Sequence, residues 1–107
     1  MKRAIRFRLI YDEQVWDHVA AIGTKYHSLI RNTIERMLTF EPQVETRNRK
    51  PLLKPSILGS AWELRFGPNN RFRVYYRTDQ ELREVYILAI GVKIKNRLWI
   101  GNEEIEL

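Results

Sequence analysis

Cysteine is absent from the 107-residue chain, so nothing in it suits a thiolate metal site or an oxidising compartment. No apolar run approaches the length of a membrane span, and the basic start lacks the apolar core of a signal peptide. Internal repeats and low-complexity tracts are also missing. The length fits one domain, residues 1–107, that buries a modest core without metals or disulfides. We therefore expect a soluble cytoplasmic protein without membrane contact.

Acidic side chains are scarce in one stretch of the chain. The formal net charge of +6 and the isoelectric point near 9.9 favour association with polyanions. Between residues 46 and 77, Glu63 is the single acid. The same stretch holds eight basic residues: Arg47, Arg49, Lys50, Lys54, Arg65, Arg71, Arg73 and Arg77.

The segment from residue 62 onward carries most of the structural signal. Three runs rich in Val, Ile, Tyr and Phe are separated by turn signals at residues 67–70 and 79–81, which predicts a three-stranded antiparallel meander. Because side chains alternate between the two faces of a strand, residues at odd positions share a face. Such a face is typical of the solvated side of a half-buried sheet, and also of a surface that binds phosphates. Its members are Arg65, Arg71, Arg73, Tyr75 and Arg77.

The first half of the chain predicts a strand and a helical hairpin. Residues 2–10 alternate basic and apolar side chains, as expected of a strand with one wet face. A short amphipathic helix then begins at Asp12, and a second one begins at Thr24 and ends at Pro42. Residues 41–60 contain several prolines and few periodic apolar residues, which indicates an extended connection.

Five pieces of the sequence occur in the order and with the spacing of a known family. They are the helical hairpin that ends at a proline, KPLLKP at residues 50–55, WELRF at 62–66, RFRVYY at 71–76 and ILAIGVKIKNRLWIG at 87–101. In these pieces, which cover essentially the whole chain, the sequence resembles the RelE/ParE superfamily of small toxins from toxin–antitoxin pairs. The resemblance implies an α+β fold. An N-terminal strand and a helical hairpin would pack on a twisted, mainly antiparallel four-stranded sheet, with the substrate surface on the opposite face.

The resemblance also implies one of two activities. RelE-like members cut messenger RNA in the ribosomal decoding site, where the ribose 2′-hydroxyl attacks the adjacent phosphate without a metal or any small-molecule cofactor. This reaction needs a group that takes the 2′-proton, positive charge around the pentacoordinate phosphorane, and an acid for the 5′-oxygen. ParE-like members poison DNA gyrase and lack the catalytic residues. A toxin-fold protein that only binds its partners is a further alternative.

Matching the chain to the RNA-cutting members implies a set of site residues. Arg73 falls at the position of the transition-state arginine, and Arg65 and Lys93 fall at two further basic positions. Trp99 falls at the position of an aromatic residue, where an indole can stack on a base. The implied partners are messenger RNA on the ribosome and a cognate antitoxin. The expected RNA-binding residues are Lys54, Arg71, Arg77, Tyr75, Lys95 and Trp99.

Two departures from the family pattern leave the proton-transfer groups open. Glu63 replaces a lysine of the best-studied type, and Trp99 replaces a tyrosine, although an indole N–H is not a useful acid. Glu63 fits either a general base held ionised by Arg65 or a simple cross-strand ion pair. Lys54 is another candidate for the base or for a phosphate clamp. His18 lies in the first predicted helix, remote in sequence from the basic meander, and we interpret it as a packing residue.

Overall fold

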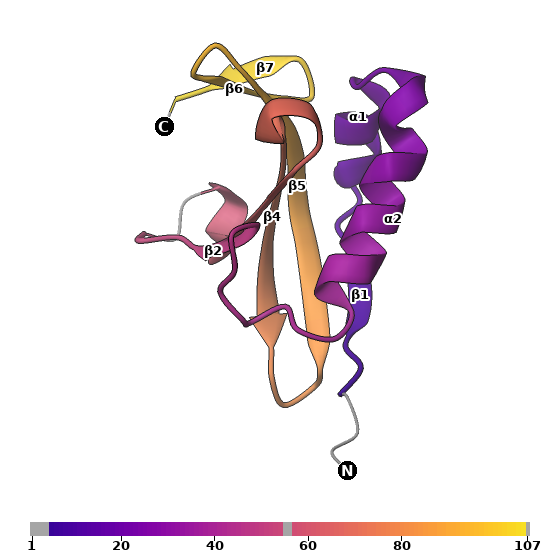
Figure 1. Ribbon diagram of the computed structural model, residues 1–107, viewed down its shortest axis with the longest axis vertical. Helices are drawn as coiled ribbons and strands as arrows, with labels where there is room; N and C mark the ends of the chain where they lie inside the picture. Colours follow the sequence, from indigo (N-terminus) through magenta and orange to yellow (C-terminus); the bar gives the residue numbers. More distant parts are fainter. Residues whose placement is uncertain (1–4, 55–56, 107) are drawn as a thin grey trace.

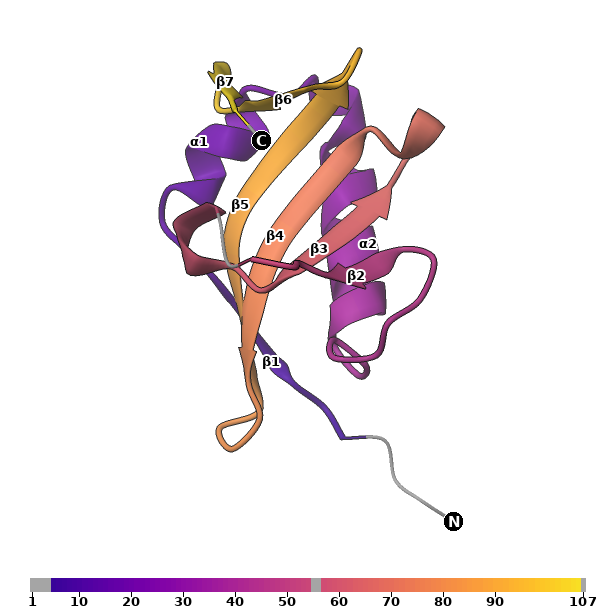
Figure 2. The ribbon, with the colours of Figure 1, turned by 90° about the vertical axis from the view of Figure 1, so that its left-hand side faces the viewer.

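The computed structural model describes residues 5–54 and 57–106, and Figure 1 shows its two layers. Helices α1 (Val15–Ala20) and α2 (His27–Leu38) cover one face of a twisted sheet. The sheet order is β2-β3-β4-β5-β6-β7, and β1 lies beside β5. Figure 2 shows the opposite face, which no α-helix of the described ranges covers. The strands are β1 (Arg8–Tyr11), β2 (Arg49–Pro51), β3 (Trp62–Phe66), β4 (Phe72–Asp79), β5 (Glu84–Ile94), β6 (Arg97–Ile100) and β7 (Glu103–Ile105). Short 3-10 turns are η1 (Thr24–Tyr26), η2 (Ile57–Gly59) and η3 (Pro68–Asn70).

The predicted helical hairpin is confirmed, with differences at the ends of its elements. The chain passes through η1 before α2 begins, and no side chain caps the start of η1 or α2, so the expected cap from Thr24 is not formed. Helix α2 ends before Pro42, which lies in the connection that follows. The first strand begins at Arg8. Residues 2–4 of the predicted strand lie outside the described residues.

The meander of β3, β4 and β5 is confirmed, but the prediction of four strands in all was too low. Two-residue turns at Lys95–Asn96 and Gly101–Asn102 have positive φ at both positions, which is the backbone of a type I′ hairpin turn. These turns divide the predicted last strand into β5 and β6 and make β7 from the acidic segment. Strand β2 forms within the predicted connection and pairs with β3, and its Pro51 is tolerated because β2 is an edge strand.

Strand β5 is the longest strand and has two neighbours along one edge. Strand β1 runs parallel to its first part, with Arg8 opposite Glu84, and β6 runs antiparallel to its last part. Between these two neighbours, the N–H of Ile90 donates a hydrogen bond of 3.2 Å to His18 Nδ1. A Cβ atom at Gly91 would lie 2.8 Å from the carbonyl oxygen of Trp99, so the close approach of β6 requires glycine there.

A β-bulge in the pairing of β4 with β5 decides which side chains face the open side of the sheet. Tyr75 lies opposite Ala89 and Tyr76 lies opposite Ile87, which leaves Leu88 as an extra residue. The extra residue reverses the alternation along the rest of β5. Lys93, two residues beyond the position opposite Arg73, therefore comes to the same face as that arginine.

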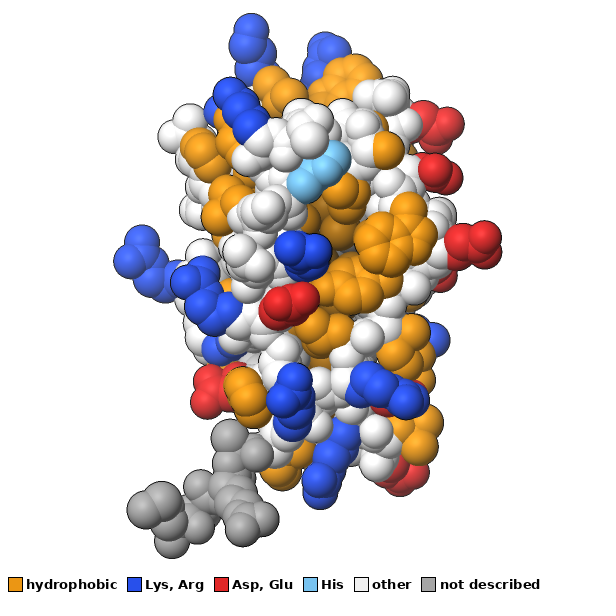
Figure 3. All heavy atoms as spheres, turned by 90° about the vertical axis from the view of Figure 1, so that its right-hand side faces the viewer, with side chains coloured by type: hydrophobic (Ala, Val, Ile, Leu, Met, Phe, Trp, Pro, Cys, Tyr) orange, Lys and Arg blue, Asp and Glu red, His pale blue; other side chains and the backbone are white. Residues whose placement is uncertain are grey.

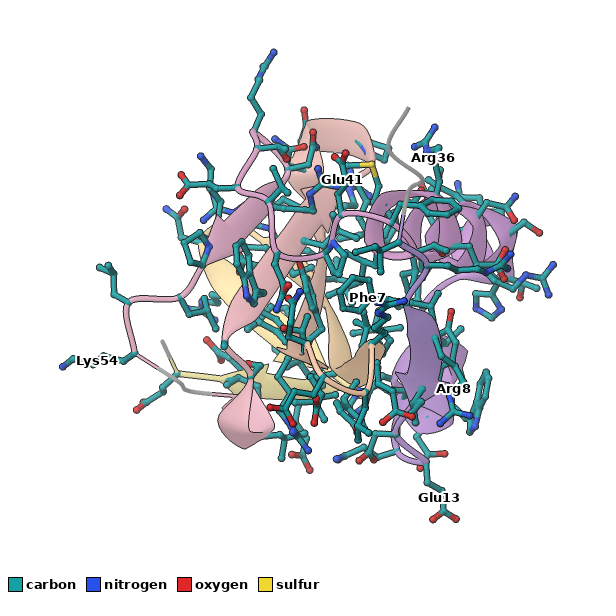
Figure 4. The ribbon with its side chains drawn as sticks, turned by 90° about the horizontal axis from the view of Figure 1, so that it is seen from below. Phe7, Arg8, Glu13, Arg36, Glu41 and Lys54 are labelled. Atoms are coloured by element: carbon teal, nitrogen blue, oxygen red, sulfur yellow. The ribbon has the colours of Figure 1, made fainter. Side chains whose placement is uncertain are left out.

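Side chains from both layers form the main core. Tyr76 is fully buried, and its hydroxyl donates a 2.7 Å hydrogen bond to the carbonyl oxygen of Pro42, which fixes the connection after α2 to the sheet. Figure 4 shows Phe7 pointing inward between the helices and the sheet. Other members of this core are Ile30, Ile34, Leu38, Leu64, Phe72, Val74 and Ile87. A smaller cluster on the open face contains Tyr75, Ala89, Leu98 and Ile100.

Candidate anion-binding site

A cationic hollow of about 430 Å³ lies where β4 begins and β5 ends. The turn η3 and the Lys95–Asn96 turn form its walls, and the N–H of Lys93 donates a 2.7 Å hydrogen bond to the carbonyl oxygen of Arg71. Four positive side chains around one hollow raise the local concentration of anions, and an arginine guanidinium can bind a phosphate through two parallel hydrogen bonds. The lining residues are Asn69, Arg71, Arg73, Lys93, Ile94, Lys95 and Asn96.

The guanidinium of Arg73 is fixed on two sides. Its Nε donates a 2.9 Å hydrogen bond to the carbonyl oxygen of Asn70, and its Nη1 lies 3.3 Å from Glu63 Oε1. Only 11% of the Arg73 side chain is exposed. Guanidinium N–H groups that these two contacts do not use remain available for an anion in the cationic hollow. Arg73 is therefore a preorganised donor at this site.

Glu63 connects Arg73 with Arg65. The two arginines lie directly opposite each other on β3 and β4, an arrangement of like charges that destabilises a sheet. Glu63 Oε1 accepts a hydrogen bond of 2.5 Å from Arg65 Nε in addition to its contact with Arg73. The carboxylate thus offsets the repulsion between the two guanidinium groups. The ion pair of Glu63 with Arg65 is present but runs along β3, and the cross-strand ion pair of Glu63 is with Arg73.

The second oxygen of Glu63 is held by Tyr75. The buried hydroxyl of Tyr75 donates a 2.7 Å hydrogen bond to Glu63 Oε2, which confirms that Tyr75 shares the face of the arginines. Burial raises the pKa of Glu63, but the hydrogen bonds from Tyr75 and Arg65 and the charges of both arginines outweigh it, so the pKa lies below its usual value. Burial and the neighbouring carboxylate raise the pKa of Tyr75. The pair is therefore an ionised carboxylate and a neutral phenol.

Six of the ten predicted site residues do not line the cationic hollow: Lys54, Glu63, Arg65, Tyr75, Arg77 and Trp99. Lys54 projects away from the body of the molecule (Figure 4). The guanidinium of Arg77 lies 4.4 Å from the centre of the Tyr86 ring, further along β4. Arg65 lies outside the hollow, opposite Arg73 on the neighbouring strand, and Glu63 bridges the two arginines.

Trp99 does not share the face of Arg73 and Lys93, as the matching had implied, but lies on the helix side near Arg71. Trp99 pairs with Val92 across β5 and β6 and lines a mainly apolar pocket with His18 and Tyr26. Arg71 and Ile94 line both this pocket and the cationic hollow, so the two are adjacent. The reason for the change of face is the turn at residues 95–96. In a single straight strand Lys93 and Trp99 would share a face, but the reversal of the chain puts Leu98 opposite Lys93 and sends Trp99 to the helix side.

Asparagines at turns were missed as parts of the site. Asn69, Asn70 and Asn96 have positive φ, a conformation that asparagine tolerates better than most residues. Asn69 and Asn96 line the cationic hollow, and Asn70 fixes Arg73. The sequence did indicate turns at these asparagines, because asparagine between strands is typical of a turn. It did not indicate that these turns lie beside Arg73, since that depends on how the strands pair.

Among the described residues no helix is both long enough and apolar enough to cross a membrane.

Comparison with known proteins gives a structural match alone. A chain of the RelBE2 toxin–antitoxin complex from Mycobacterium tuberculosis superimposes with a TM-score of 0.65, at 21% sequence identity over 80% of this chain and 96% of the other. No family model matches the sequence, and no curated protein matches it. The expected α+β fold of the RelE type is therefore confirmed.

Proposed function

We propose that this protein is the toxin of a toxin–antitoxin pair and that it cuts messenger RNA on the ribosome, in the cytoplasm. The observation that carries the proposal is the convergence of Arg71, Arg73, Lys93 and Lys95 on one hollow, with Arg73 fixed on two sides. A gyrase poison has no need of such a preorganised cationic site. The structural match to a chain of a toxin–antitoxin complex supports the first half of the proposal.

The proposed reaction uses the cationic hollow as the site of the scissile phosphate. The ribose 2′-oxygen attacks phosphorus and loses its proton, the bond from phosphorus to the 5′-oxygen breaks, and the 5′-oxygen gains a proton. The products are a 2′,3′-cyclic phosphate and a 5′-hydroxyl. Negative charge increases on the phosphorane oxygens in the transition state, and a fixed guanidinium stabilises that charge without first having to reorient. Arg73 has this role, and the lysines add positive charge around it.

Replacing Arg73 tests the proposal. Arg73→Ala should slow cleavage about a hundredfold, because the loss of one fixed donor costs about 3 kcal/mol of transition-state stabilisation. Primer extension on ribosome-bound message measures the rate, and circular dichroism checks the fold. Arg36→Ala is the control, since Arg36 is an exposed arginine of α2 outside the cationic hollow, and its cleavage rate should stay near that of the wild type.

Undiminished cleavage by folded Arg73→Ala would remove this residue from the mechanism. Pulse labelling of protein and of DNA after induction tests the choice of target. Message cutting stops protein synthesis first. Failure of DNA synthesis first, with covalent gyrase–DNA complexes trapped, would assign the protein to the ParE-like activity instead.

A further inference from the structure

We propose that Glu63 is a positioning residue, whose buried carboxylate holds Arg73 in the orientation that meets the scissile phosphate, and that Tyr75 holds the carboxylate in turn. This inference rests on the proposed RNA cleavage. It assigns Glu63 a role that differs from both a general base and a simple cross-strand ion pair.

The contacts of Glu63 leave it poorly placed to act as a base. Its side chain is 8% exposed, and both carboxylate oxygens accept hydrogen bonds from neighbouring side chains. Oε1 accepts from Arg65 and Arg73, and Oε2 accepts from Tyr75. A general base must come within hydrogen-bond distance of the 2′-hydroxyl. Arg73 is among the residues that line the cationic hollow, whereas Glu63 is not and contacts Arg73 from outside it.

The charges explain why a carboxylate is needed at this position. Arg65 and Arg73 face each other across β3 and β4, so without a negative group between them their guanidinium groups would repel and separate. Glu63 reduces the positive field of the trio to a net single charge while it fixes the geometry. Loss of the Glu63 charge should therefore strengthen the attraction for a phosphate in the ground state and weaken the fit to the transition state. The affinity for the substrate should therefore increase while the rate of the chemical step decreases.

Tyr75 completes the arrangement. Its hydroxyl belongs to a buried ring in the small cluster on the open face, so the position of the hydroxyl is set by packing. Because this fixed hydroxyl donates a 2.7 Å hydrogen bond to Glu63 Oε2, it also restrains the orientation of the carboxylate. A phenylalanine in place of Tyr75 keeps the ring and removes this contact alone.

Steady-state kinetics of Glu63→Gln test the proposal. The amide keeps the shape of the side chain, so kcat should fall by about tenfold to a hundredfold as Arg73 loses its orientation, while KM falls because the field is more positive. Tyr75→Phe should give a smaller fall in kcat with little change in KM. The pH profile of kcat should keep its shape in both variants, because the guanidinium stays charged throughout.

Glu84 provides a matched control. It is also a buried carboxylate of this sheet, it accepts a 2.6 Å hydrogen bond from Tyr86 and one from Arg8, and it lies outside the cationic hollow. Glu84→Gln should therefore leave kcat and KM unchanged. Binding of an oligonucleotide with a 2′-deoxyribose at the cleavage position measures ground-state affinity without chemistry, and it should be tighter for Glu63→Gln than for the wild type.

Several results would overturn the inference. Wild-type kcat and KM in folded Glu63→Gln would show that the carboxylate positions nothing, and an increase in KM would contradict the electrostatic argument. Loss of the acidic limb of the pH profile in Glu63→Gln would identify Glu63 as a general base. A wild-type protein that cuts no RNA would instead remove the proposed function itself, which is a different result from normal cleavage by the variant.

Discussion

At the scale of single residues, the His18 side chain accepts a backbone hydrogen bond from β5 where no neighbouring strand of the described residues pairs with it. Strand β5 has β1 beside its first part and β6 beside its last part, and the N–H of Ile90 between them donates to His18 Nδ1. A ring nitrogen accepts a hydrogen bond only when it carries no proton, so this contact requires the neutral imidazole. Burial lowers the pKa of His18, and the charges of Asp17 and Asp12 oppose the shift in part. The expected packing role of this histidine is thus accompanied by a specific hydrogen bond.

The stability of the protein should fall on acidification because of His18. Its pKa in the folded state lies below the usual value of 6.5, so the unfolded chain binds more protons when the pH falls through 6.5. The stabilising contribution is complete above this pH and is lost progressively below it. Urea unfolding of the wild type and of His18→Gln at pH 7.5 and pH 5.5 measures the effect. The variant should show the smaller difference in free energy of unfolding between the two pH values, and equal differences would contradict this role.

Side-chain alternation made part of the site predictable. The alternation of side chains along a strand was sufficient to predict that Arg65, Arg73 and Tyr75 share one face. The prediction holds because the pairing of β3 with β4 has no register shift. The role of Glu63 was not predictable, because it depends on which donors surround the carboxylate in space. Trp99 was assigned to the wrong face because a turn of two residues precedes it.

At the scale of elements, turns decide the shape of the cationic hollow. The turn between β3 and β4 begins at Gly67, which has φ of +82°. A Cβ atom at this position would lie 2.4 Å from the ring of Phe72, a core residue at the start of β4. Both the backbone conformation and the close approach require glycine, so this turn supports the wall of the hollow and the core together.

Gly67→Ala should therefore cost more stability than an alanine at a similar glycine elsewhere. Gly59 has φ of +80°, but a Cβ atom there meets no atom within 4 Å. We expect a loss of about 1 kcal/mol for Gly59→Ala from the backbone alone, and about 2–4 kcal/mol for Gly67→Ala, where overpacking adds to it. Urea unfolding at neutral pH gives both values. Equal losses would mean that the Phe72 ring moves aside at no cost.

The missed elements are all short, and β1, which is equally short, was predicted from the alternation over the longer stretch of residues 2–10. The meander and α2 carry a hydrophobic pattern over many residues, and such patterns are reliable. Strands β2, β6 and β7 have only three or four residues each, too few for a pattern to be read. Gly101–Asn102 was nevertheless a recognisable signal for a two-residue hairpin turn. The bulge at Leu88 had no signal of its own, because it arises from the pairing of two strands.

At the scale of the whole molecule, a partner can bind either of two faces, one cationic and the other largely apolar. The open face of the sheet carries the cationic hollow. The helix side shows a broad band of apolar side chains with scattered charges (Figure 3). A groove of about 370 Å³ between α1 and α2 contributes to that side, with Tyr11, Trp16 and Ile34 among its lining residues. Under the proposed function, an antitoxin is expected to cover one of these faces.

We expect the antitoxin to cover the cationic face, where it would mask Arg65, Arg73 and Lys93. Charge mainly speeds encounter and apolar burial mainly sets the lifetime of a complex, so salt should slow association much more than it speeds dissociation. Stopped-flow measurements from low salt to 0.5 M salt should show the association rate fall by at least about tenfold. An association rate indifferent to salt would indicate that the antitoxin binds the apolar groove on the helix side.

The parallel pairing of β1 with β5 has a consequence for the timing of synthesis. Arg8 and Glu84 are 76 positions apart, and β5 supplies Lys93 to the cationic hollow. A ribosome that adds roughly 5–20 residues per second needs several seconds after β1 to synthesise β5, the strand with which β1 pairs. During those seconds the nascent chain has no central strand and no complete hollow. A ribosome that makes this protein has therefore read the message as far as Asn96 before the surface proposed to cut messages exists.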